Sequence, residues 1–495
     1  MKNINSIKRF NKALPALMLV LICFTACEDL TEKPVGIATP TTFYSSILQC
    51  EAALTGSMAP LWGWYVSNSY GDGSGIGGTF SNDDQMEGGD LIIGEGHATN
   101  LWTGHYRSIS NINSLLDAVL NRASLAKFSQ EEVDEVVAQA KFIRAFNYFY
   151  LVRMFGALPL ITEDTPDPVK TPVTTRTPIA QVYALIVEDF TFAMENLPSR
   201  TDLDGANPGR PTSGAAKGFL AKVYLTMATA PLNDVSKFAD AARLAKEIID
   251  DGEYALVSDI NDVFLQSNKY SSEHMWSFNT TVDDPQVDAL GGKPEEHGGY
   301  GGELVAVDFD TSFVDQPRRD AYLLRYLILD GDSVGYSDLS SGTPHIRKLY
   351  NVPYISLDEQ DGGSAANWFI LRYADILLIY AEAQNQVALN QSAVDAINQI
   401  IERANGDTGT EPLATIGMTK AAFDAKVIQE RSWELCFELG DRWFDLVRKR
   451  MIEEANADNP DAVNNFSSDP NPSYYLFPIP TVDAGLIGQN PGYNF

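Results

Sequence analysis

Residues 141–161 read KFIRAFNYFYLVRMFGALPLI, and this stretch decides the fold. On a helical wheel Phe142 and Phe149 share one face, and apolar residues continue around most of the circumference. A helix that is apolar almost all round is buried by neighbours on several sides. Arg144 and Arg153 interrupt the run, which argues against a lipid-facing span of about 20 residues. The stretch therefore predicts a central, buried helix.

Both ends of this helix carry recognisable signals. Ser129 and Glu132 have the spacing of a capping box, which satisfies backbone N–H groups that the start of a helix leaves free. Gly156 suits a helix stop, and Pro159 cannot continue the helix. The predicted helix therefore ends at Phe155.

Helical periodicity recurs along the chain, in segments joined by short connections. The predicted helices span 42–59, 102–125, 129–155, 178–197, 212–228, 236–251, 372–383, 394–404 and 419–451. Thr177 is the expected N-cap of the fourth of them. Repeated, short-looped helix pairs are typical of a superhelical stack. The predicted fold class is mainly α: an α-superhelix of tetratricopeptide-like helix pairs.

Residues 257–365 differ in composition from the rest of the chain. Gly, Asp, Ser and aromatic residues, Trp276 among them, replace the Ala/Leu pattern. Long irregular segments inside a compact protein are more often functional than idle. We therefore expect an irregular, loop-rich middle subdomain on the ligand side, between an N-terminal helical part (41–256) and a C-terminal helical part (366–495).

The first 26 residues have the pattern of a bacterial export signal, with basic residues followed by an apolar stretch from Ala13 to Phe24. Small residues directly precede Cys27, which resembles a lipoprotein signal in which that cysteine becomes acylated. The alternative is an ordinary cleaved signal with an incidental cysteine. We expect a lipid anchor at Cys27 and an extended tether over 27–40.

The charge of the chain limits its partners. The formal net charge is −30, and the basic residues of the signal precede the first acidic residue, Glu28. A strongly acidic surface repels phosphate backbones, so nucleic-acid binding is excluded as an expected function.

The sequence predicts no metal or cofactor site. Cys50 and Cys436 are too far apart to supply zinc-ligand spacing, and the five histidines show no helical pairing. An oxidising periplasm permits a disulfide between these cysteines, but two buried thiols fit the sequence equally well. The loops 202–207 and 330–338 carry oxygen ligands without the spacing of a calcium loop, so we expect acidic turns there.

Two glycine motifs resemble catalytic or cofactor motifs only on paper. Gly73 to Gly78 fits the dinucleotide-binding pattern but lacks the strand before it and the helix after it. Gly331 to Gly335 fits a nucleophile elbow but no helix follows its serine, and Asp330-Gly331 is a favourable hairpin turn. We interpret both as loops.

Paired carboxylates raise the alternative of a glycan hydrolase. Glu430, Glu434 and Glu438 recur at helical spacing. Glycoside hydrolases cleave the glycosidic bond with a pair of carboxyl groups, so paired acids could indicate such an enzyme. Arginines at 431, 442 and 448 share the predicted helix, with Asp445 three residues before the last of them. Because ion-paired carboxylates make poor general acids, we expect a structural salt-bridge network and a protein that is not an enzyme.

Aromatic residues next to polar loops are the best candidates for ligand contacts. Aromatic faces stack on sugar rings, while carboxylates and amides bind hydroxyls. Trp64 and Tyr65 precede a loop rich in Gly, Ser, Asn and Asp, and Tyr300 lies between glycines. The predicted ligand-binding residues are Trp64, Tyr65, Tyr70, Asp83, Asp84 and Tyr300.

The central helix, with its flanks, closely resembles the signature of the SusD/RagB family of outer-membrane nutrient-binding lipoproteins. The matching positions are Arg144-Ala145, Tyr148, Leu151-Val152, Phe155-Gly156 and Pro159-Leu160. Later stretches extend the resemblance: Arg372–Asp375, Tyr380–Ala383, Glu430–Arg448, Phe477–Pro480 and Gln489–Tyr493. Leu439 separates Glu438 from Gly440, which are usually adjacent in the family.

The resemblance implies a non-enzymatic protein that is lipid-anchored at the outer membrane and faces the cell exterior. Glu28-Asp29 resembles the acidic tag that directs family members there. The implied ligand is an oligosaccharide or glycan fragment, and the implied partner is a TonB-dependent, SusC-like barrel transporter. The alternatives are a surface-anchored glycan hydrolase, a peptide-binding member of the same family and a scaffold that binds only protein.

Overall fold

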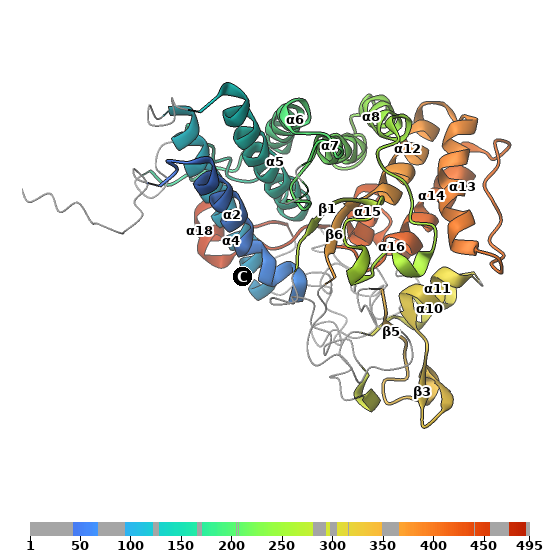
Figure 1. Ribbon diagram of the computed structural model, residues 1–495. Helices are drawn as coiled ribbons and strands as arrows, with labels where there is room; N and C mark the ends of the chain where they lie inside the picture. The colour runs from blue at the N-terminus through green and yellow to red at the C-terminus, as the bar shows by residue number, and fades with distance from the viewer. Residues whose placement is uncertain are drawn as a thin grey trace, which may run out of the picture. The chain divides into compact units, whose positions relative to one another are not determined.

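A computed structural model of the chain (Figure 1) describes most of the residues from 43 onward. The described ranges are 43–67, 95–121, 128–165, 171–203, 205, 207–280, 294–297, 304–314, 316–348, 366–439, 441–455 and 475–491, with the backbone alone at 62–67, 95 and 97. Residues 44–495 form one compact unit. Within the described ranges, no helix has both the length and the apolar character that crossing a membrane requires.

The described part of the chain is mainly helical, as expected. Its longer helices are α2 (Ile47–Ser67), α4 (Glu95–Asn121), α5 (Gln130–Phe155), α6 (Ile179–Asn196), α7 (Ser213–Met227), α8 (Lys237–Asp251), α12 (Tyr373–Ala388), α13 (Gln391–Asn405), α14 (Lys420–Glu434) and α15 (Asp441–Lys449). Short helices are α10 (Val307–Ser312), α11 (Pro317–Tyr322), α16 (Ile452–Ala455) and α18 (Thr481–Ile487).

The helices stack in chain order. Each of α2, α4, α5, α6, α7 and α8 packs against the next, α8 packs against α12, and α12 packs against α13 and α14 (Figure 1). Packing of each helix mainly against those next to it in the stack is the arrangement of helical-repeat proteins. The prediction of tetratricopeptide-like pairs is confirmed.

The α5 helix lies in the core, as its sequence predicts. Ser129 is the N-cap and forms the complete capping box with Glu132. Every residue from Val136 to Phe155 is buried except Lys141. Gly156, with φ of 73°, ends the helix.

Several predicted helix boundaries in the N-terminal half are wrong. The helix expected to begin at residue 102 begins at Glu95. The helix expected over 42–59 begins at Ile47 and continues through Pro60 to Ser67. Proline removes one backbone donor from the helix, yet α2 continues past Pro60. The two helices pack closely at this point, because a Cβ at Gly104 of α4 would lie 2.9 Å from the carbonyl oxygen of Pro60. Pro178, rather than Thr177, is the N-cap of α6, and it makes no side-chain cap hydrogen bond.

The single helix predicted over 419–451 is also wrong. The chain turns between α14 and α15, where Phe437 and Leu439 adopt positive φ values of 62° and 40°. Such a conformation is uncommon for residues other than glycine and persists only where the surroundings enforce it. Leu439 is the residue that departs from the family pattern, and it lies at this turn.

The middle segment contains short strands that the sequence did not reveal. Strand β1 (His274–Phe278) pairs antiparallel with β6 (Trp368–Arg372), which leads directly into α12. Both strands are buried along their whole length, so they lack the polar alternation by which a half-buried strand is recognised. A second pair is β2 (Leu323–Leu324) with β5 (His345–Ile346).

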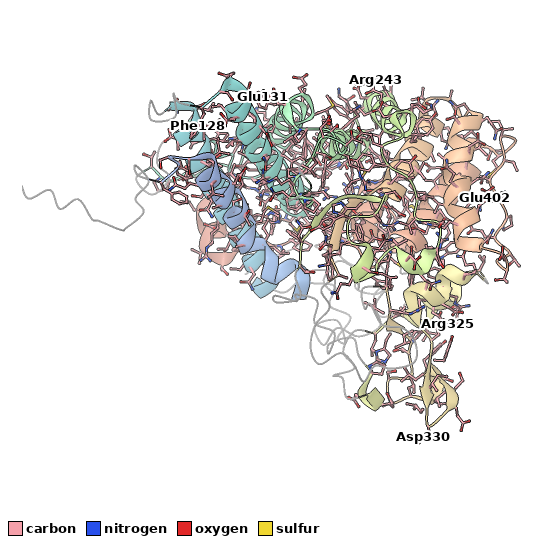
Figure 2. The ribbon with its side chains drawn as sticks, in the orientation of Figure 1. Phe128, Glu131, Arg243, Arg325, Asp330 and Glu402 are labelled. Carbon is pink, nitrogen blue, oxygen red and sulfur yellow. The ribbon has the colours of Figure 1, made fainter. Side chains whose placement is uncertain are left out.

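The hairpin prediction at Asp330-Gly331 is confirmed. Strands β3 (Tyr326–Leu329) and β4 (Asp332–Gly335) pair across this turn, in which both central residues have positive φ. Figure 2 shows Asp330 at the tip of the hairpin, pointing away from the helices. Ser333 lies on a strand, so the nucleophile-elbow alternative has no structural support.

Candidate functional site

A pocket of about 380 Å³ lies beside α2, where β1 approaches α5. It is lined by Glu51, Leu54, Thr55, Met58, Ala59, Gln139, Ile143, Gly209, Arg210, Pro211, Trp276, Ser277, Phe278 and Asn279. Its size falls within the range of small-molecule pockets, about 300–1,000 Å³.

The floor of this pocket is apolar and firmly held. Trp276 on β1 packs edge-to-face against Phe142 at 4.8 Å and against Phe146 at 5.0 Å, both on α5. Edge-to-face pairs are favourable ring arrangements, and here they fix the indole from two sides. The signature helix α5 therefore positions the aromatic floor of the pocket.

Polar groups line the rim. Arg210 pairs with Glu51 of α2 at 2.9 Å, and both side chains are about a quarter exposed, at 22% and 26%. Asn279 accepts hydrogen bonds from Ser277 (3.0 Å) and Asn367 (3.1 Å) through its side-chain oxygen. Charged and amide groups above an aromatic floor are the combination that can bind hydroxyl-rich ligands.

Gly209 is required where the loop 207–211 meets Asn279. A Cβ at Gly209 would overlap the Asn279 amide, whose nitrogen donates to the carbonyl oxygen of Gly209 at 3.4 Å. Any larger residue would displace that amide from the rim.

The structure describes the backbone of two of the predicted residues. Trp64 and Tyr65 lie on the last turns of α2, not on a loop as expected, and their backbones alone are described.

The remaining predicted positions lie outside the described residues. These are Tyr70, Asp83, Asp84, Tyr300 and the anchor cysteine Cys27, together with the glycine loop 73–78. Their roles stay predictions.

Sequence reasoning missed most of the pocket. Trp276 carried a signal as an aromatic residue of the irregular middle, but its position on a fully buried strand was not foreseen. Glu51, Arg210 and Asn279 carried none, because they come from three separate segments that only the fold brings together.

The acidic residues proposed for the salt-bridge network are ion-paired, but with partners from elsewhere in the fold. Glu434 accepts from Arg372 at 2.8 Å and from Arg403 at 2.5 Å. Glu438 pairs with Arg372 at 2.8 Å and with Lys348 at 2.5 Å. Glu438 forms no ion pair with Arg442, four residues further along the chain, because the turn before α15 separates them.

The basic residues of the same predicted helix are paired in a comparable way. Arg431 reaches Asp375 at 2.8 Å and Asp445 at 2.7 Å, while Arg448 pairs with Asp445 at 2.8 Å as its spacing suggested. Arg442 forms no ion pair with any residue that the structure describes. The ion pairs therefore connect α12, α14 and α15 to one another, rather than joining residues of a single helix.

Glu430 departs from the expectation that paired carboxylates keep low pKa values. Complete burial raises the pKa of Glu430 to about 7, although Arg318 opposes the change. A raised pKa alone does not make a general acid, because the side chain is fully buried and has no path to a substrate.

Fold and pocket together define a helical-repeat protein with a pocket of ligand size on one side of the stack. Residues 331–493 match the SusD family, and residues 66–225 match a family described as "Starch-binding associating with outer membrane". The chain belongs to the SusD/RagB family, as the sequence motifs indicated.

Individual proteins extend these matches over nearly the whole chain. SusD-like protein P2 of Formosa agariphila is 29% identical, over 96% of this chain and 98% of its own. A SusD superfamily protein from Parabacteroides distasonis has a crystal structure that is 26% identical, with a TM-score of 0.73 over 90% of this chain and 99% of its own. A laminarin-binding SusD-like protein has the same fold, with 22% identity and a TM-score of 0.69 over 90% and 99%.

Proposed function

We propose that this protein captures an oligosaccharide or glycan fragment at the cell surface and passes it to a barrel transporter in the outer membrane. The observation that carries the proposal is the pocket beside α2, an aromatic floor under a polar rim, in a member of the SusD/RagB family. A solved structure of a laminarin-binding SusD-like protein supports the choice of a carbohydrate ligand.

The geometry suits a sugar in two respects. The apolar face of a pyranose ring can lie against Met58, above the buried Trp276, while its hydroxyls reach Glu51, Arg210 and Asn279. A pocket of 380 Å³ holds one or two sugar rings, so a longer glycan would continue past it. The end of α2, with Tyr65, and the predicted contacts Tyr70, Asp83, Asp84 and Tyr300 are proposed to extend the site.

A glycan array probed with residues 28–495 tests this function. We expect binding to one family of neutral or acidic glycans and no release of products from the bound glycan. The glycan-hydrolase alternative predicts product release, and the peptide-binding alternative predicts a signal on a parallel peptide array only.

The proposed location rests on Cys27. Each buried methylene of an acyl chain contributes about 0.8 kcal/mol, and stable anchoring needs more than one chain or signal. Cys27→Ala should therefore move the protein from the outer-membrane fraction to the soluble fraction. Cys50→Ala, which changes a buried thiol, is the matched control and should leave fractionation unchanged.

Delivery to a TonB-dependent, SusC-like barrel is supported by family membership. Co-purification of a barrel from the native membrane with the tagged, lipidated protein would support it. Purification of the lipidated protein alone under the mildest detergent conditions would count against it.

A further inference from the structure

A second pocket, of about 400 Å³, lies at the other end of α5. It is enclosed by the end of α5, the start of α6, the loop at Ala230, α15 and the C-terminal segment around Leu476. Arg153 of this pocket follows Ile143 of the first pocket by ten residues on one helix, about 15 Å along the axis. The two pockets are therefore separate.

The charge of this second pocket is opposite to that of the chain. Arg153, Arg448 and Arg450 line it, and its described lining contains no aspartate or glutamate. The chain as a whole has 66 acidic residues against 36 basic ones. Arg448 is already paired with Glu382 and Asp445, so Arg153 and Arg450 are the lining cations without a carboxylate partner among the described residues, and they favour an anionic occupant.

Arg153 is the unusual member of this cluster. It is only 8% exposed, and its guanidinium lies over the rings of Phe149 at 3.9 Å and Phe444 at 3.7 Å. Its Nε donates to the carbonyl oxygen of Phe149, but its Nη2 makes no hydrogen bond to any residue that the structure describes.

The other buried arginines show what Arg153 lacks. Each of them holds at least one carboxylate within ion-pair distance; they are Arg144, Arg318, Arg372, Arg431 and Arg448. Arg153 has no carboxylate within ion-pair distance among the described residues; the rings of Phe149, Tyr150 and Phe444 lie against its guanidinium, which also hydrogen-bonds the side chain of Tyr150. Buried charges are normally paired, so a negative group from outside the chain would complete this one.

We propose that this pocket binds a small organic carboxylate with an apolar body. The carboxylate accepts hydrogen bonds from Arg153 and, at the open side, from the exposed Arg450. A guanidinium group and a carboxylate are both planar and can form a bidentate pair of parallel hydrogen bonds. The apolar body packs against Ile179, Val447 and Leu476. An inorganic anion would leave this apolar part of the pocket empty.

The probes are benzoate, its neutral isostere benzamide, and acetate, which carries the charge without the body. Binding to the whole mature chain is measured by calorimetry and by saturation-transfer NMR. We expect benzoate to bind at least tenfold more tightly than either of the other two. Equal binding of benzamide would overturn the role of the charge, and equal binding of acetate would overturn the role of the apolar body.

Variants locate the site. Arg153→Met should weaken benzoate binding at least tenfold, and Arg450→Gln, at an exposed position whose guanidinium lies over the ring of Tyr475, should weaken it several-fold. Arg107→Gln, an exposed arginine on α4 outside the pocket, is the matched control and should bind as the wild type does. If Arg153→Met fails to fold, Arg450→Gln decides. Unchanged benzoate affinity in Arg450→Gln, or no benzoate binding by the wild type at millimolar concentration, would overturn the proposal.

Discussion

Arg144 of α5 forms a two-pronged ion pair with Asp189 of α6: Nε lies 2.7 Å from Oδ2, and Nη2 lies 3.0 Å from Oδ1. Both side chains are buried, at 1% and 0% exposure. The pair joins two neighbouring helices of the stack. The arginine of the signature helix is therefore a structural group, not a ligand contact.

Removing one partner of this pair should be costly. Asp189→Asn leaves Arg144 with Glu163 as its carboxylate, and breaking a buried pair typically costs about 3–5 kcal/mol. Chemical denaturation should show a loss of that order. Glu188→Gln, the neighbouring exposed carboxylate that lies 3.6 Å from Lys141, should cost no more than about 1 kcal/mol. Equal losses in the two variants would contradict the assignment.

Because the chain turns between α14 and α15, Arg431 and Arg442 should contribute differently to the stability of the fold. Arg431→Met breaks buried pairs with both Asp375 and Asp445, and it should lower the free energy of unfolding by about 3–5 kcal/mol. Arg442→Met removes no described ion pair and should cost clearly less. Thermal melts of the two variants check this, and a larger loss in Arg442→Met would show that the ion pairs are assigned wrongly.

Acid should destabilise the fold through Glu382. Burial alone would raise its pKa, but the paired Arg448, with bonds of 2.6 and 2.7 Å, lowers the pKa of Glu382 to about 2. A carboxyl whose folded pKa lies below its unfolded value of about 4.3 stabilises the fold above that value. This stability is lost as pH falls from about 4.5 to 2.

The corresponding measurement is a denaturation series between pH 6 and pH 2. Glu382 contributes on the order of 3 kcal/mol to the decline. Glu382→Gln should be less stable than the wild type at pH 6 and should lose less stability on acidification. A variant whose stability declined in parallel with that of the wild type would exclude Glu382 as a source of the acid sensitivity.

The cysteine question that the sequence left open is answered by two buried, free thiols at Cys50 and Cys436. Burial raises the pKa of Cys436 to about 11 and raises that of Cys50, and a protonated thiol reacts slowly. Native residues 28–495 should therefore take up no iodoacetamide at pH 8, while denatured protein should take up two equivalents without any reductant. A mass spectrum showing no alkylation after denaturation would indicate a disulfide.

The features predicted best from the sequence are the repeated helices and the local signals that begin, end or turn an element. The capping box at Ser129, the stop at Gly156 and the hairpin at Asp330 all depend on neighbours a few residues away, and all were found where expected. The burial of Arg144 followed from its apolar surroundings. Its partner Asp189 did not, because nothing in the sequence marks which of many acids the fold brings to it.

The candidate site was predictable only in part. The aromatic residues now at the end of α2 were predicted to bind the ligand, and that stays a prediction; the helix was expected to stop before Pro60, so the register of Tyr65 could not be assigned. Trp276 lies on a strand buried on both faces, which leaves no periodic signal. The extent of α2 and the position of Trp276 both depend on packing between segments that are far apart in the sequence.

The most direct test of the account is the affinity of the best array glycan for the double variant Arg210→Gln/Asn279→Ala, measured by calorimetry beside the wild type. The control is Arg243→Gln, an exposed arginine on α8 whose ion pairs are solvent-exposed. If the pocket beside α2 holds the sugar, the double variant loses at least tenfold in affinity and melts close to the wild type, because both side chains lie at the rim. Wild-type affinity in the double variant would contradict the central claim.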